Sequence, residues 1–405
     1  MPNQRPKKFL RWVLIASSIN TLICMLLTFW LLNRPTWNGA EMSLFQYTTL
    51  FKTLILGIEE KPAKKDFLFV DVSQDKQLVE LLDNDGIPVG NLAITDREKL
   101  TELLNILAQK PKNQKMVLCD MMFDQKSPSD SALEVAMNKL PNLLLSYIFD
   151  GDKDTLMLPP FKKVKRGLAN YETYDNTFLK FRLFYRDTLP TVPVKMYELL
   201  HNKKPQMGKF FNSLNERKIL NHFVTNLRIR NYDLFDIDPK QRYNWIGLGD
   251  LLMFPDDIHK ICKDRIVIVG SFQNEDKHNT IYGDLAGPLI LVNTYLALKN
   301  GDNIIAVGWV IWLVIGFFGL SFFLFWQLDF RKSKLQRLVG QWQIKYVIRF
   351  LTYSLGLSII SIISFFVFGI HLNILWLSFL FYLIDSILKT NYRKRGWLSK
   401  PESAL

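Results

Sequence analysis

Polar side chains that could bind a ligand close or follow three apolar runs of the chain. The runs, Phe67–Val72, Met116–Cys119 and Ile266–Val269, have the length and composition of buried strands. The side chains at or just beyond their ends are Asp71, Ser73, Asp120, Asp124, Asp276 and His278. Such carboxylates could coordinate Mg²⁺ or Ca²⁺, whereas together with Arg97 and His278 they could hold a polar small molecule.

The location of these residues depends on how the three strands are arranged. In a parallel sheet, Asp71, Asp120 and Gly270 end neighbouring strands on one edge, and ligands of open α/β sheets bind at that edge near a switch in strand order. The alternative is that these are turn and cap residues, with an Arg–Asp salt bridge that orders the loops. Both interpretations stay open from the sequence.

The sequence gives no sign of catalysis or of a bound cofactor. Ser73 and Ser271 have no identifiable base, and a single histidine such as His278 is usually structural. The chain has no CxxC, no HExxH and no histidine cluster, so we predict no zinc or iron site and no enzymatic activity. Cys119 and Cys262 are expected as buried free thiols, with a disulfide between them as the alternative in an oxidising compartment.

The elements that must position these residues alternate between strand and helix. A helix is expected from near Thr95, where Thr95 and Glu98 have the spacing of a capping box, and Leu100, Leu103, Leu104 and Leu107 form its apolar stripe. A second helix is expected over about 129–140, before a strand over 142–149. This alternation predicts a mainly parallel sheet with helices on both faces.

The later elements are less regular. Residues 166–190 are rich in aromatic side chains and predict an antiparallel ribbon. A helix is expected over 191–200, a strand over 226–232, and a short helix after 246. The closing helix, about 289–299, stops at Asn300 and Gly301.

Four apolar segments have the length or composition of membrane spans. They cover 12–32, 304–328, 347–370 and 371–388, and the first is interpreted as an uncleaved anchor rather than a signal peptide. The net charge of +13 belongs mainly to Lys and Arg that flank these segments. The basic clusters put 1–11, 329–346 and 389–405 in the cytoplasm and the domain at 33–303 outside the inner membrane. Asp385 is expected near the cytoplasmic interface.

The chain resembles the second type of CHASE domain, a sensory extracellular domain associated with cyclases and histidine kinases. The resemblance covers residues 10–390 and includes the arrangement of one anchor, a large α/β domain and three later spans. Its opening strand matches at Asp71 and Ser73, Arg97 matches the Arg before the first long helix, and the second strand matches at Asp120 and Asp124. The resemblance continues in the ribbon region, at Gly167, Asn170, Asp175 and Arg182. It also includes the last strand and the residues after it, at Asp276, His278, Thr280, Gly283, Gly287 and Asn293.

This resemblance implies a sensor that binds an unknown cue, with the site residues named above as its ligand-binding group. Leu289 and Leu291 stand where the family has a Glu and a His, so the roles of those two are in doubt. The cytoplasmic segments 329–346 and 389–405 are too short to bury a catalytic core. The signal is therefore expected to pass to an unidentified membrane or cytoplasmic partner protein. The alternative is an envelope scaffold that retains the sensor fold. The lipid bilayer is the other expected partner, a homodimer stays open, and nucleic acid is not expected.

Overall fold

The computed structural model describes two compact units of the chain. It describes residues 7–35, 39–57, 61–82, 85, 87–186, 188–208, 211–236, 238, 242–273, 276–326 and 342–394. One unit comprises Met1–Leu56 with Ile304–Leu405, and the other comprises Gly57–Asn303. The basic residues expected in the loop at 331–337, and Arg395 of the tail, lie outside the described residues, whereas Lys389, Arg393 and Lys394 belong to the last described helix.

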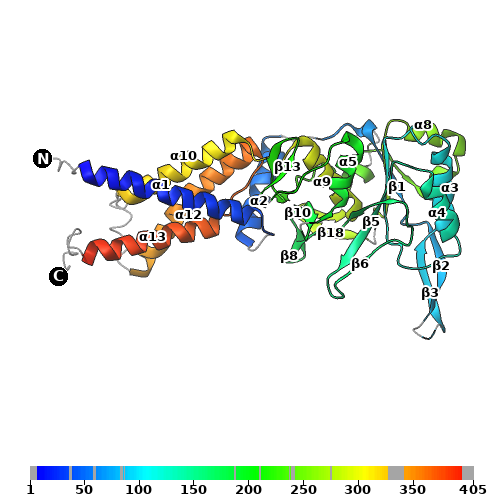
Figure 1. Cartoon of the computed structure of the whole chain (residues 1–405), viewed down its shortest axis with the longest axis horizontal. Helices are drawn as coiled ribbons and strands as arrows, with labels where there is room; N and C mark the ends of the chain where they lie inside the picture. Colours follow the sequence, from blue (N-terminus) through cyan, green and yellow to red (C-terminus); the bar gives the residue numbers. More distant parts are fainter. Residues whose placement is uncertain are drawn as a thin grey trace. The chain divides into compact units, whose positions relative to one another are not determined.

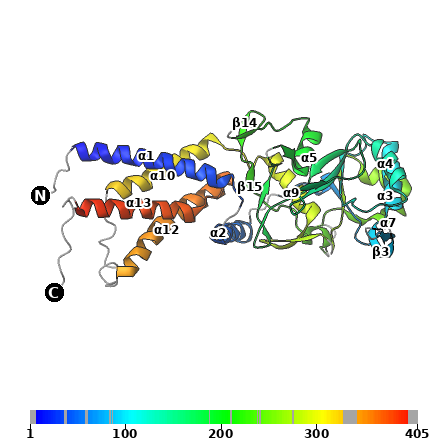
Figure 2. The ribbon, with the colours of Figure 1, turned by 60° about the horizontal axis from the view of Figure 1, so that its bottom comes forward.

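The first unit is helical. Its elements are α1 (Lys7–Leu32), α2 (Gly39–Leu50), a π-helical turn (Phe51–Ile55), α10 (Val307–Trp326), α12 (Trp342–Phe368) and α13 (Ile374–Lys394). Helix α1 runs beside α10, and α12 runs beside α13 (Figure 2). The Asn20 amide donates to the Ser321 hydroxyl over 2.8 Å, and the Trp309 indole donates to Ser364 over 2.7 Å. These bonds satisfy polar groups inside an apolar bundle.

Three helices in the described residues are long and apolar enough to cross a membrane. They are Leu10–Leu32, Val307–Trp326 and Phe350–Phe368. The fourth expected span falls on α13, whose apolar part, Ile374–Ile387, is shorter than the other three. The chain therefore has the features of a membrane protein, and the fourth crossing stays a prediction.

The second unit is built around a mainly parallel sheet. Its strand order is β16 (Trp245–Gly247), β1 (Phe67–Asp71), β17 (Ile266–Gly270), β4 (Met116–Asp120), β5 (Leu143–Asp150) and β6 (Thr155–Met157), with β7 (Lys165–Leu168) also paired to β5. All of these pairs are parallel except β5 with β6. Strands β1 and β17 are buried along their whole length, as their continuous apolar runs predict.

Helices cover both faces of this sheet (Figure 1). On one face, α3 (Arg97–Gln109), α4 (Asp130–Asn138), α7 (Leu248–Leu252) and α8 (Ile258–Cys262) surround a core that contains both Cys119 and Cys262. On the other, α5 (Val192–His201) packs against β5 and α9 (Gly287–Asn300) against β17. All three cysteines are free and buried.

The N-terminus of α3 differs from the expected capping box. Asp96 is the N-cap, and its carboxylate accepts hydrogen bonds from the backbone N–H groups of Glu98 and Lys99. The cap therefore lies one residue later than Thr95. The predicted apolar stripe is confirmed, because Leu100, Leu103, Leu104 and Leu107 are all buried.

Smaller strands complete the unit. A hairpin of β2 (Lys76–Leu82) and β3 (Pro88–Thr95), absent from our expectations, precedes α3. The ribbon region forms β8 (Thr173–Tyr174), β9 (Thr177–Phe178), β10 (Lys180–Arg182), β11 (Phe184–Tyr185) and β12 (Leu189–Pro190). Later elements are β13 (Asn212–Leu214), β14 (Arg217–Ile219), β15 (His222–Val224), α6 (Tyr232–Phe235), β18 (Lys277–Thr280) and β19 (Gly283–Ala286), with 3₁₀ turns at Lys64–Asp66 and Pro255–Asp257.

The prediction of a strand over 226–232 is wrong. This segment forms no strand, and Tyr232 instead begins α6. The reason is a side chain: Asn293 of α9 accepts from the Ile229 N–H over 2.9 Å and donates to the Ile229 carbonyl over 2.7 Å. The backbone of Ile229 is thus satisfied without a partner strand.

Candidate functional site

The sheet brings three predicted strand ends into register. Asp71 pairs with Gly270, and Gly270 pairs with Asp120. Strand β17, the last strand of the sheet in chain order, is inserted between β1 and β4. The loops that leave these strands diverge at this edge, which is where open α/β sheets bind ligands.

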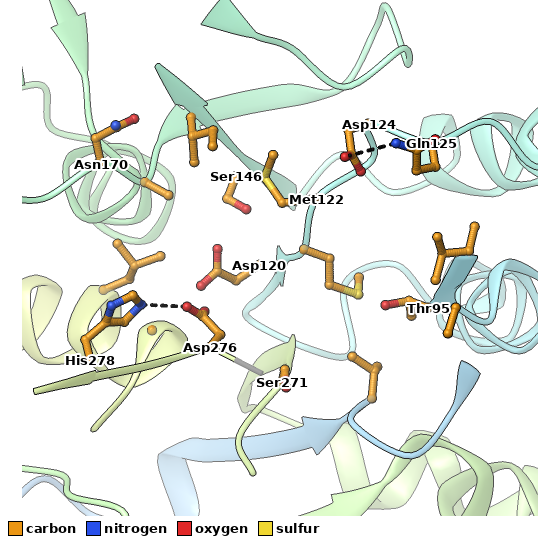
Figure 3. Close-up of a pocket in the computed structure, with 18 of the residues that line it drawn as sticks. Thr95, Asp120, Met122, Asp124, Gln125, Ser146, Asn170, Ser271, Asp276 and His278 are labelled. Atoms are coloured by element: carbon orange, nitrogen blue, oxygen red, sulfur yellow. Dashed lines mark hydrogen bonds and ion pairs between the residues drawn. The ribbon is translucent and has the colours of Figure 1, made fainter. Parts of the chain in front are cut away.

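A cavity of about 540 Å³ opens at this edge, beside β4 and β5 (Figure 3). The hairpin of β2 and β3, the segment Ala169–Tyr171 and the start of α9 form its other walls. Its polar lining residues are Lys76, Thr95, Asp120, Asp124, Gln125, Ser146, Asn170, Tyr171, Ser271, Asp276 and His278. Four of the seven predicted site residues therefore line one cavity.

Asp276 and His278 form a fixed pair on one side of the cavity. Their side chains are 2.6 Å apart, from Nε2 to Oδ1, because residues two apart at the start of β18 point to the same side. The Tyr171 ring packs edge-on against the imidazole, with ring centroids 4.6 Å apart.

Gly287 makes room for the Asp276 carboxylate. Its backbone N–H donates to the Asp276 carbonyl over 2.8 Å. A Cβ at this position would lie 2.1 Å from Asp276 Oδ2, so only glycine fits without displacing the carboxylate. The first residue of α9 therefore holds the pair in place.

The Asp120 side chain points toward this pair (Figure 3). Burial, with the negative charge of Asp276 added, raises the pKa of Asp120 to about 7. A hydrogen bond from Ser146 and the nearby His278 oppose this rise. The two carboxylates thus repel each other in a site where positive charge would relieve the repulsion.

Asp71 and Ser73 do not line the cavity. Asp71 Oδ1 accepts from the Ser73 N–H over 3.0 Å, from the Ser73 hydroxyl over 2.5 Å and from the Phe272 N–H over 3.2 Å. The Ser73 hydroxyl also lies 3.0 Å from that of Ser271. This geometry fits the alternative interpretation, in which Asp71 fastens the loops after β1 and β17.

Arg97 is also outside the cavity lining. Its side chain is only 1% exposed, and its guanidinium carbon lies 4.3 Å from the centre of the Phe123 ring. Nη1 lies 3.9 Å from Asp130 Oδ1, and burial lowers the pKa of Arg97. This contact is the Arg–Asp ion pair of the alternative interpretation.

Several cavity residues were not predicted as ligand-binding. Ser146 is the single small polar side chain in the apolar run of β5, and that exception was the available signal. Nothing in the sequence around Tyr171 or Lys76 sets either residue apart. Among the residues described, no three His, Cys, Asp or Glu side chains form a group that could hold a metal ion.

A comparison with protein families identifies one match, the CHASE2 domain, over residues 21–326 of the chain. Searches with the chain found no match among curated proteins and none among solved structures.

Proposed function

The chain belongs to the CHASE2 family of sensory extracellular domains, and on this premise we propose that it is a membrane-anchored sensor. Its second unit binds a small ligand in the cavity at the carboxyl ends of β4 and β17. The family is sensory rather than catalytic, so the bound state is passed to a partner protein and not to a reaction.

The observation that carries this proposal is the cavity in which the carboxylates of Asp120 and Asp276 point toward each other (Figure 3). Three carboxylates and one ammonium group, that of Lys76, line it. Apolar side chains supply the remaining walls; they include Met121, Met122, Ile148 and Leu291. This lining suits a small organic cation with a short apolar part, because the cation offsets the repulsion between the carboxylates.

Helix α9 is the element that would transmit a conformational change from the cavity to α10. Gly287 and Leu291 of α9 line the cavity, and the helix is buried from Gly287 to Leu298. It ends at Asn300, and α10 begins at Val307. A buried helix moves as a rigid element, and residues 301–306 are the chain segment that leads from α9 to the start of the apolar helix α10.

The proposed topology has four membrane crossings. The N-terminus, the segment 329–346 and the tail lie in the cytoplasm, and 33–303 lies in the periplasm or outside the cell. The cytoplasmic segments or the helical unit then contact the partner.

Calorimetry on the full chain in maltoside micelles tests the ligand class. Putrescine, choline and arginine are the cationic probes, and succinate is the anionic control. We expect one or more of the cations to bind, and Asp120→Asn to abolish binding, while Asp256→Asn, which removes an exposed carboxylate outside the cavity, has no effect. If no cation binds, or if Asp120→Asn leaves binding intact, the result counts against the proposal.

A further inference from the structure

A second pocket, of about 640 Å³, lies at the opposite edge of the same sheet. Trp245 begins β16, and Arg265 directly precedes β17, so the pocket is at the amino ends of these parallel strands. The ligand cavity lies at their carboxyl ends. The two sites are therefore separated by the length of the strands.

The pocket is strongly basic. Arg242, Lys260 and Arg265 line it, against the single carboxylate of Asp257. Within the described ranges, no ion pair joins any of the three cations to a carboxylate. Side chains of like charge around one hollow repel each other, and a bound anion removes that repulsion.

Trp245 also lines the pocket, but its indole N–H does not face the open space. The indole Nε1 of Trp245 is inaccessible to solvent and has no hydrogen-bond partner among the described residues. The ring is held edge-on against Phe235, with centroids 5.2 Å apart. The Trp245 N–H is therefore out of reach of a ligand in the pocket, and the basic side chains are the groups that could bind one.

We propose that this pocket binds the phosphate group of a small anionic molecule. Three cations and one carboxylate leave a net charge of +2, which matches a phosphate monoester of charge about −2 rather than a monocarboxylate. The guanidinium groups of Arg242 and Arg265 suit the oxygens of a phosphate, because each can donate paired, charge-assisted hydrogen bonds. This site is independent of the sensing cavity and does not require the proposed cation.

Calorimetry with glycerol 2-phosphate on the full chain in maltoside micelles, in Tris buffer, tests this inference. We expect binding that Arg265→Gln weakens about tenfold or more, since a charge-assisted bond is lost. Trp245→Phe removes only an N–H that does not face the pocket, and should leave affinity unchanged. Lys263→Gln is the matched control: it removes an exposed positive charge close to Arg265 but outside the pocket lining, and should leave affinity unchanged.

Other outcomes would overturn the inference. One is the absence of binding by glycerol 2-phosphate and inorganic phosphate at millimolar concentration. Another is equal weakening by Lys263→Gln and Arg265→Gln, which would indicate general surface charge. Tight binding of acetate would refute the charge matching. Circular dichroism of each variant confirms that it is folded.

A lipid whose headgroup is a phosphate monoester, such as phosphatidic acid, carries the same chemistry as a soluble phosphate monoester. Micelles with added phosphatidic acid distinguish the two sources. Competition by that lipid, lost in Arg265→Gln, supports the phosphate site and identifies a headgroup as its source. Undiminished binding of glycerol 2-phosphate in the same micelles supports a soluble ligand.

Discussion

Replacing Asp120 with Asn should flatten the pH dependence of the stability of the second unit. The pKa of Asp120 is about 7 in the folded chain, against about 3.9 in an unfolded one. Between these values the folded state holds a proton that the unfolded state has released. The free energy of unfolding therefore falls as pH rises towards 7, and the ionised carboxylate is a cost above it.

The size of this effect follows from the shift in pKa. A shift of about 3 units corresponds to about 4 kcal/mol at 1.36 kcal/mol per unit. Asp120 is only partly buried at the cavity wall, so screening by water reduces this to about 2 kcal/mol. For a unit of this size, that energy moves the melting temperature by roughly 4–8 °C.

Thermal unfolding of the full chain in micelles, at about pH 5 and about pH 8.5, measures the effect across the range in which Asp120 titrates. At pH 5 the unfolded carboxyl is already ionised, so the melting temperature of Asp120→Asn minus that of the wild type should rise by about two-thirds of this amount, roughly 3–5 °C, between the two conditions. Asp256→Asn supplies the baseline for loss of one exposed negative charge. Parallel curves for the wild type and Asp120→Asn would refute the electrostatic account of the site.

Further changes test other parts of the structure. Gly287→Ala places a Cβ 2.1 Å from Asp276 Oδ2 and should abolish cation binding in calorimetry, whereas Gly90→Ala, with open space around it, should not. Leu104→Ala empties part of the buried core and should cost about 2–5 kcal/mol in thermal or denaturant unfolding, against less than about 0.5 kcal/mol for the exposed Leu78→Ala. Arg228→Gln removes a two-bond ion pair with Asp302, at 2.7 and 3.0 Å, and should cost about 2 kcal/mol, whereas Lys153→Gln, an exposed partner of Asp150, should cost under about 1 kcal/mol. A reporter fused after Leu200 should be active only outside the cytoplasm, and a cytoplasmic signal would overturn the topology.

Part of the candidate site could be predicted because strand ends are local features. A continuous apolar run followed by a carboxylate identified Asp120 and Asp276 before any fold was known. The hairpin of β2 and β3 was missed because its apolar and polar residues alternate only weakly; Leu78, for example, is 72% exposed. The contribution of Tyr171 could not be predicted, because it depends on where the ribbon region packs.

The sequence by itself determined the elements that depend on neighbouring residues. Long uncharged runs specify membrane helices, and short apolar runs specify buried strands, because each segment must remove its own side chains from water. Only the tertiary structure decided which polar residues share a cavity. Asp71 and Asp120 look alike in the sequence, yet one is tied to Ser73 and Phe272 while the other faces Asp276. The residues that follow β17 cause this difference, because Phe272 reaches Asp71 and Asp276 reaches Asp120, and the insertion of β17 between β1 and β4 brings both within reach.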